Sequence, residues 1–236
     1  MAEEIDLPDT SDPIVLAVGE GALWFLDGSR LFQIWKYDLA RRQASSIDTG
    51  DVTIDGLAMA GGALWTVCTE FLRIDPATGE IEATIDPGAG QGDLVVGTED
   101  AIWFAGTQES PIASSRGARM WRVDPETSSI VATIDLDEII VDIAAGEGAV
   151  WLLTLEDDLV SRLDPATNEV AAAFRMGRIP EAIAVGEGAV WVASARDGTV
   201  TRFDPKTADV KTIEVGGTPT DLAAGAGGVW VAVKAT

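Results

Sequence analysis

Histidine is absent from this 236-residue chain, and cysteine is almost absent. Without histidine, the chain can build neither a Ser-His-Asp catalytic triad nor a histidine-ligated zinc site. Cys68 is the single cysteine, so neither an intrachain disulfide nor a cysteine-based metal site can form. Of the catalytic chemistries considered, acid and base catalysis by paired carboxylates is still possible.

Basic residues are scarce as well: 16 Lys and Arg stand against 39 Asp and Glu, which gives a net charge of -23. A surface of this sign repels phosphate backbones and anionic lipids, so we expect no nucleic-acid partner and no direct membrane binding. The N-terminal stretch lacks the basic and apolar regions of a signal peptide, and no apolar run is long enough to span a membrane. We therefore expect a soluble protein, in the cytoplasm or outside it.

Six tryptophans mark an internal repeat. They are Trp24, Trp65, Trp103, Trp151, Trp191 and Trp230. Each follows a turn and a pair of small or aliphatic residues, as in GEGAVW and AGGALW, and neighbours along the chain are 38 to 48 residues apart. A period near 40 with four short β-type runs is the size of a propeller blade, and no segment is long enough for helical repeats. We predict an all-β fold, a six-bladed β-propeller of four-stranded antiparallel blades.

The whole chain is predicted to be one domain. We place its blades at about 12–50, 51–90, 91–137, 138–177, 178–217 and 218–236. The last range holds only two strands, and residues 3–7 align with the outer strand of the blade before it. We therefore expect the N- and C-terminal strands to close the last blade together, although its third strand has no evident donor. We expect a monomer.

A second repeated feature is an Asp-Pro turn, as at Asp124 and Asp204. Proline presets φ and the aspartate side chain caps the turn. A basic residue stands two positions before each turn aspartate. These residues are Lys36, Arg73, Arg122, Arg162 and Arg202. Because the pairing occurs in all five copies, we interpret it as a structural ion pair or a cation stacked on an aromatic ring, not as an anion site.

Acidic residues recur where five consecutive inner strands are predicted to begin. They are Asp55, Asp93, Asp142, Glu181 and Asp221. They align within one position of one another, whereas the first blade has Ile14 and Val15 there. Such a ring at the mouth of the central channel would suit Ca²⁺ or Mg²⁺, because both prefer oxygen ligands. The alternative interpretation is that these aspartates only cap strand-entry turns.

The repeat is broken most clearly in the third blade, where the segment from Gly106 to Trp121 is about ten residues longer than its counterparts. Long loops in compact domains are often functional, although a tolerated surface insertion is an alternative. The loop is expected on the same face as the acidic ring. We predict a ligand surface there formed by Glu109, Arg116, Arg119, Trp121, Asp157 and Arg196.

The unit VGEGAVWVASARDGTVTRFDPKTADVKTIEVGGTP, residues 185–219, resembles the repeat of bacterial YVTN-type propellers. That group is related to NHL-like and streptogramin-lyase-like (virginiamycin B lyase) propellers. The resemblance implies the propeller fold, and members of the group include binding domains, sensor domains and a few enzymes. Streptogramin lyases use a catalytic histidine with an acidic residue and a divalent cation, so the absence of histidine here departs from their pattern.

From these features we expect a non-enzymatic binding, scaffold or sensor propeller. It would recognise a protein, a peptide or a small polar ligand on the channel-mouth face. One alternative is a lyase or hydrolase that uses carboxylates and a divalent cation. The other is a structural module of a longer chain or an engineered repeat protein, without an activity of its own.

Overall fold

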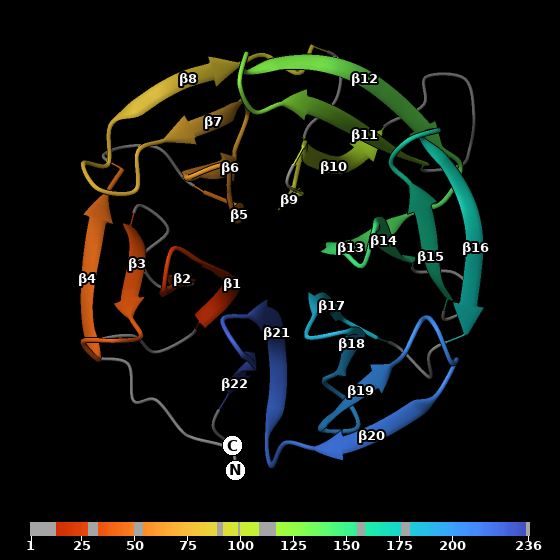
Figure 1. The fold of residues 1–236 in the computed structure, drawn as a ribbon. Coiled ribbons are helices and arrows are strands. Elements are labelled where there is room, and N and C mark those ends of the chain that lie inside the picture. Colours follow the sequence, from red (N-terminus) through yellow and green to blue (C-terminus); the bar gives the residue numbers. More distant parts are fainter. Residues whose placement is uncertain are drawn as a thin grey trace.

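The computed structural model describes residues 13–27, 33–49, 54–88, 92–98, 100–108, 117–154, 159–175 and 180–234. These residues form 22 β-strands and no helix, arranged as antiparallel sheets around a central axis (Figure 1). The predicted all-β propeller arrangement is confirmed. No described segment is a helix with the length and apolarity that crossing a bilayer requires.

Five of the sheets are four-stranded blades in which each strand pairs with the next along the chain. Blade one contains β1 (Pro13–Gly19), β2 (Ala22–Asp27), β3 (Gln33–Asp38) and β4 (Gln43–Asp48). Blade two contains β5 (Gly56–Ala60), β6 (Ala63–Val67), β7 (Phe71–Ile74) and β8 (Ile81–Ile85). Blade three contains β9 (Leu94–Gly97), β10 (Ile102–Gln108), β11 (Gly117–Asp124) and β12 (Ser129–Leu136).

The next two blades have the same order of strands. Blade four contains β13 (Ile140–Gly146), β14 (Ala149–Thr154), β15 (Leu159–Asp164) and β16 (Glu169–Arg175). Blade five contains β17 (Ala182–Gly186), β18 (Ala189–Ser194), β19 (Thr199–Phe203) and β20 (Val210–Glu214).

The sixth sheet has two strands among the described residues, β21 (Thr218–Gly225) and β22 (Gly228–Lys234). The described ring therefore contains five four-stranded blades and one two-stranded sheet, and the described residues do not complete the predicted sixth four-stranded blade. Residues 3–7, predicted to supply the outer strand of this sheet, lie outside the described residues.

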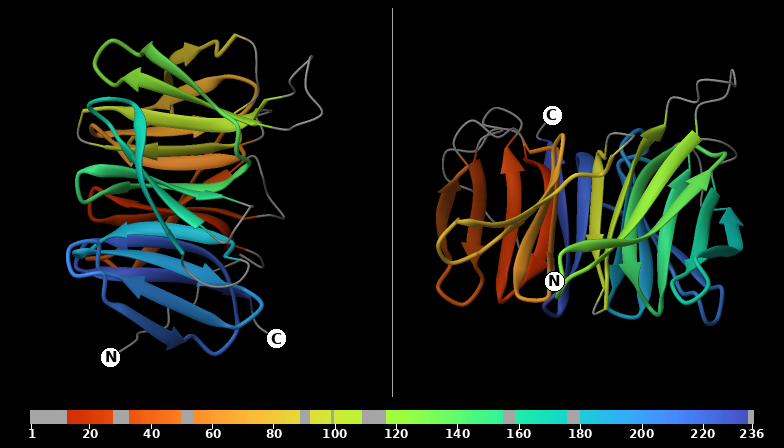
Figure 2. Two further views of the ribbon diagram at one scale, coloured as in Figure 1. Left: turned by 90° about the vertical axis from the view of Figure 1, so that its right-hand side faces the viewer. Right: turned by 90° about the horizontal axis from the view of Figure 1, so that it is seen from above.

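The inner strands of the six sheets surround the axis. They are β1, β5, β9, β13, β17 and β21, and each contacts the next, with β21 contacting β1. The ring therefore closes where the N-terminal blade meets the C-terminal sheet (Figure 1). Seen from the side, the sheets stand next to one another around the axis (Figure 2).

The repeated tryptophan segment builds the hairpin between the inner and second strands. In blade four, Glu147 and Gly148 have φ values of 51° and 74°, as a two-residue type I′ turn requires. The indole N–H of Trp151 donates to the carbonyl of Gly146, at 3.2 Å. The same bond is made by Trp24, Trp65, Trp191 and Trp230. The segment thus encodes both a tight turn and the side chain that fastens it.

The Asp-Pro turns are built as the sequence indicates. Oδ1 of Asp124 accepts the backbone N–H groups of Glu126 and Thr127, at 2.8 and 3.0 Å. The basic residue before the turn stacks on the tryptophan of its own blade, and Arg122 lies 5.3 Å from the ring centroid of Trp103. Lys36, Arg73 and Arg202 are placed in the same way. Four of the five basic residues therefore fit the interpretation as stacked cations.

Candidate ligand-binding channel

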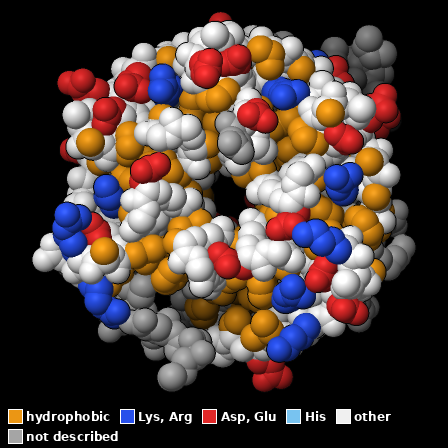
Figure 3. Space-filling model, viewed as in Figure 1, with side chains coloured by type: hydrophobic (Ala, Val, Ile, Leu, Met, Phe, Trp, Pro, Cys, Tyr) orange, Lys and Arg blue, Asp and Glu red, His pale blue; other side chains and the backbone are white. Residues whose placement is uncertain are grey.

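A channel of about 320 Å³ lies along the ring axis and is lined by residues of all six inner strands. Figure 3 shows its opening at the centre of one face. Each inner strand pairs with the second strand of its own sheet only, so its other edge is turned toward the channel. Backbone N–H groups on such an edge need partners, and the channel is where those partners must lie.

All five acidic residues predicted at the strand entries line this channel, but they lie at two levels. On each inner strand one residue pairs with the repeat tryptophan of the second strand, as Ala144 pairs with Trp151. Asp142 and Asp221 each lie two residues before this residue of their own strand. Asp55, Asp93 and Glu181 stand one residue earlier, where the backbone N–H donates to a carbonyl of the second strand. Because neighbouring strand residues point in opposite directions, the offset of one residue separates the five acids into two sets.

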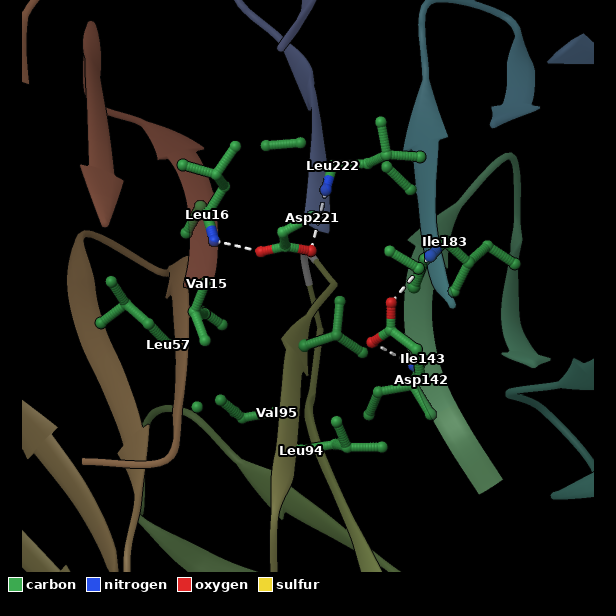
Figure 4. A pocket seen from close by; sticks show the side chains of 18 of the residues that line it. Val15, Leu16, Leu57, Leu94, Val95, Asp142, Ile143, Ile183, Asp221 and Leu222 are labelled. Carbon is green, nitrogen blue, oxygen red and sulfur yellow. Dashed lines mark hydrogen bonds between the residues drawn. The ribbon is translucent and has the colours of Figure 1, made fainter. Parts of the chain in front are cut away.

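Asp142 connects blade four to blade five. Its Oδ1 accepts the backbone N–H of the next residue, Ile143, at 2.8 Å. Its Oδ2 accepts the backbone N–H of Ile183 on β17, at 2.7 Å (Figure 4). Both amides belong to unpaired inner-strand edges, so this carboxylate joins two blades that have no sheet pairing with each other.

Asp221 makes the same connection across the point where the ring closes. Its Oδ1 accepts the backbone N–H of Leu222, at 2.8 Å, and its Oδ2 accepts the backbone N–H of Leu16 on β1 (Figure 4). A β-bulge precedes both Asp142 and Asp221, since the pairing register shifts by one residue just before each of them. The regular register resumes at each aspartate, so these two differ in level from the other three acids because they lie one residue nearer to the residue that pairs with the tryptophan.

The environment of these two carboxyls favours their protonated forms. Burial raises the pKa of Asp142 to about 7, although its two backbone hydrogen bonds act in the opposite direction. Burial raises the pKa of Asp221 well above its usual range, and the negative charge of Asp142 raises it further. Two carboxyls that interact in this way titrate as a pair. A positive charge beside the pair would stabilise the ionised forms of both carboxyls and so lower their pKa values.

The rest of the channel wall at this level is apolar or small. The equivalent residues in the other four sheets are Val15, Gly56, Leu94 and Ala182. Leu57 and Val95 lie on the side of the channel away from Asp142 and Asp221 (Figure 4). At the level of Asp142 and Asp221 the channel therefore has one polar side, with these two carboxyls, and one apolar side, formed by blades one to three; Asp55 and Asp93 lie at the other level.

No protein-family model matches this chain, and no curated protein matches it. The channel geometry alone therefore identifies the candidate site.

The acidic ring does not form a metal cluster. Within the described ranges, no three acidic, cysteine or histidine side chains lie together closely enough to hold an ion. Asp55 and Glu181 are exposed and Asp93 is half-buried. Asp142 and Asp221 already use their oxygens on backbone amides. Ca²⁺ takes six or more oxygen ligands, which this arrangement does not supply, so the Ca²⁺ or Mg²⁺ site remains a prediction from sequence alone.

The predicted ligand surface is brought together only in part. Trp121 is 1% exposed and packs edge-on against Phe71, with 5.3 Å between ring centroids. Nε of Arg119 lies 2.6 Å from a carboxylate oxygen of Asp135 on the neighbouring strand. Arg196 is exposed in the turn between β18 and β19. The remaining three, Glu109, Arg116 and Asp157, lie outside the described residues. Trp121 thus acts as a core residue here, and only Arg196 presents an exposed side chain.

Sequence reasoning missed the ring of backbone amides around the channel. Six residues share one register position, just before the partner of the repeat tryptophan. They are Leu16, Leu57, Val95, Ile143, Ile183 and Leu222. Four of these N–H groups donate to Asp142 or Asp221. Backbone groups leave no residue-type signal, and only the strand alternation around the tryptophan could have located them.

Proposed function

We propose that this chain is a non-enzymatic binding propeller that takes a peptide or small polar ligand at the channel mouth. The ligand would place a positively charged group against Asp142 and Asp221 and its apolar part against the opposite wall. A positive charge offsets both the burial of these carboxyls and their mutual repulsion. The net charge of -23 would also attract such a ligand toward the molecule.

One observation carries this proposal: two half-buried carboxyls stand in the channel at a register position where the other four sheets have apolar or small residues. At the same register position the other sheets have Val15, Gly56, Leu94 and Ala182, and their inner strands contact their neighbours in the same closed ring. A buried ion-pairing group costs stability, and hydrophobic residues of similar size often pack as well or better. Because apolar or small residues occupy this position in the other four sheets, we infer that the two carboxyls serve ligand binding.

The finer features of the fold belong to the same proposal. We take the two-stranded sheet as the sixth blade of the ring, because β21 occupies the inner position between β17 and β1. We also propose a relationship to YVTN-type, NHL-like and streptogramin-lyase-like propellers. The support is the repeated pattern of turn, tryptophan, basic residue and Asp-Pro turn in this sequence.

The proposal is tested by calorimetric titration with guanidinium, with methylammonium and with a short lysine-containing peptide. Asp142→Leu and Asp221→Leu are compared with the wild type, because leucine stands at this position in blade three. Asp55→Asn is the matched control, since it changes an exposed acid at the mouth. We expect binding to the wild type and to Asp55→Asn, and at least a tenfold loss in the two leucine variants. Equal affinity in all four proteins would overturn the proposal.

An enzyme that uses carboxylates is the second candidate. The observation that favours it is the pKa of about 7 at Asp142, since catalytic acids and bases work best near the operating pH. A divalent cation would then be needed as its partner. Titration with Ca²⁺, Mg²⁺ and Mn²⁺, read as a change in the melting temperature, distinguishes the two functions. A rise that disappears in Asp221→Leu would favour the enzyme over the binding propeller.

A further inference from the structure

The two bridging carboxylates of the channel follow a regular pattern around the ring. Asp142 on blade four accepts the backbone N–H of the next residue and that of Ile183 on blade five. Asp221, two sheets further along the ring, accepts the N–H of the next residue and that of Leu16 on blade one. Each carboxylate satisfies the amides of two neighbouring inner strands. Three carboxylates in alternate sheets would therefore satisfy the whole ring of six amides.

The third position of this pattern is occupied by glycine. On blade two, two sheets before Asp142, the residue in the same register is Gly56. A carboxylate at this position would bridge the N–H groups of Leu57, the next residue, and of Val95 on blade three. In the part of the chain that the structure describes, no carbonyl or side chain accepts either of these N–H groups. The chain thus supplies two of the three carboxylates that its amide ring can hold.

Gly56 leaves room beside these two amides. A Cβ added to it would lie 3.1 Å from the carbonyl oxygen of Asp93 and 3.3 Å from Cγ1 of Val95. A side chain here would therefore point toward blade three, as that of Asp142 points toward blade five. The same Cβ would lie 2.8 Å from Cγ1 of Val67, which is too close without a shift of that side chain. An acceptor for the two amides can instead come from a molecule in the channel.

The two amides belong to buried residues on the channel wall. Leu57 is 4% exposed and Val95 is 9% exposed, and both line the channel on the side away from Asp142 and Asp221 (Figure 4). A buried N–H group without an acceptor costs free energy, so a group that accepts both is favoured. A carboxylate matches them, because carboxylates bridge the equivalent pairs of amides elsewhere in the ring. Hydrogen bonds to an ionised acceptor are also the stronger ones.

The charge of the channel excludes a simple anion as its ligand. Five acidic residues line the channel and the net charge of the chain is -23, so a bare carboxylate would be repelled. A molecule that carries an ammonium group as well avoids this repulsion, because its positive charge can lie against Asp142 and Asp221. A volume of about 320 Å³ is typical of a site for a small molecule. These observations together favour a small zwitterion.

We propose that the channel binds a small amino acid whose carboxylate accepts the N–H groups of Leu57 and Val95. Its ammonium group lies against Asp142 and Asp221, and its methylene groups lie between the two charged ends. This inference rests on the proposed binding function and adds the second charged group of the ligand and the place where it binds. Side chains recognise one end of the ligand, and backbone amides recognise the other.

The direct test is an amide NMR titration of the full chain with glycine, γ-aminobutyrate, methylammonium and acetate. We expect the amide proton resonances of Leu57 and Val95 to move downfield when an amino acid binds. The amides of Ile143 and Ile183 are internal controls and should move less, since each already donates to a carboxylate. Calorimetry should show that one of the two amino acids binds at least about tenfold more tightly than methylammonium, the size of one charge-assisted hydrogen bond.

A pair of variants tests the same place by steric block. Gly56→Ala puts a methyl group beside the two amides, and it is combined with Val67→Ala to remove the close contact with Val67. Val67→Ala alone is the matched control. We expect the double variant to bind the amino acid no more tightly than methylammonium, and the control to keep the wild-type preference. If the double variant does not fold, the amide titration of the wild type still decides.

The outcomes separate this inference from the proposed function. No binding of either amino acid, or binding that leaves the Leu57 and Val95 amides unmoved, would overturn the inference. Methylammonium binding in the same experiment would show that the cation site stands without it. Acetate that moves these two amides, in a protein that does not bind methylammonium, would support the carboxylate site and contradict the proposed cation site.

Discussion

Asp124 in an exposed turn and Asp142 in the channel each accept two backbone N–H groups, yet their acidities move in opposite directions. At Asp124 the bonds from Thr127 and Glu126 lower the pKa of the carboxyl. At Asp142 two bonds of similar length cannot offset burial, and the pKa rises to about 7. The comparison shows that the number of hydrogen bonds does not decide the charge state of a carboxyl. At Asp142 the loss of contact with water decides it, and at Asp221 the neighbouring negative charge of Asp142 adds to the same effect.

The largest expected effect is a dependence of stability on pH that comes from the channel. A carboxyl with a raised pKa in the folded chain stabilises the fold at low pH. That contribution is lost as the pH rises from the unfolded value, about 3.9, through about 7. The slope is about 1.4 kcal/mol per pH unit for one group. We expect the free energy of unfolding by urea to fall by about 2–4 kcal/mol between pH 5 and pH 8.

The matched control for this measurement is Asp142→Asn, which imitates the protonated carboxyl at all pH values. Its unfolding free energy should change less between pH 5 and pH 8 than that of the wild type. An equally steep change in both proteins would mean that the general negative charge of the chain, and not the channel pair, sets the pH dependence.

A medium effect is expected when both channel aspartates are replaced. The double variant Asp142→Leu, Asp221→Leu copies the residue that blade three has at this position, Leu94. Because a buried charge is replaced by an apolar side chain, we expect its stability at pH 8 to lie within about 1 kcal/mol of the wild type. At pH 5 it should be the less stable protein, since the protonated pair no longer contributes. Urea unfolding at the two pH values measures both differences, and a collapse of the fold at pH 8 would show that the two connections hold the ring together.

The smallest effect is expected in the turns. Asp124→Ala removes the acceptor of two backbone N–H groups and should lower the urea midpoint slightly at pH 7. The pKa of Asp124 is lowered in the fold, so its contribution is present above the unfolded pKa and is lost as the pH falls. The difference from wild type should therefore shrink at low pH. Asp124→Asn keeps a neutral acceptor and should show little pH dependence, and a difference that grows on acidification would contradict the account of the turns.

Much of the ring was predictable from sequence because its signals are local. The GEGAVW segment indicates a tight turn and a buried tryptophan, and Asp-Pro indicates a capped turn. Both features could therefore be predicted without information on long-range contacts. The basic residues before the turns were assigned to structure for the right reason, and Arg122 stacks on Trp103. The sequence also indicated that the third strand of the last blade has no evident donor, and the described residues of that sheet form two strands.

The site was harder to predict because its geometry depends on offsets of one residue. Asp55 and Asp142 align closely in sequence, but Asp142 lies one residue nearer to the residue that pairs with the repeat tryptophan, and strand alternation places its carboxyl at a different level of the channel. Burial of Trp121 beneath Phe71 was likewise invisible in the loop sequence around it. Backbone amides such as that of Ile183 carry no sequence signal at all. These features follow from register and packing, which the residue pattern does not specify.

The central claim is that the channel holds a carboxyl pair whose protonation responds to charge placed beside it. Carboxyl-detected NMR titration of Asp142 and Asp221, with and without guanidinium, measures this directly. We expect Asp142 to titrate at about 7 in the free protein, with Asp221 also above its usual range, and both to shift toward lower pH when guanidinium is added. Titration of both carboxyls at the values of exposed aspartates, unchanged by guanidinium, would contradict the claim.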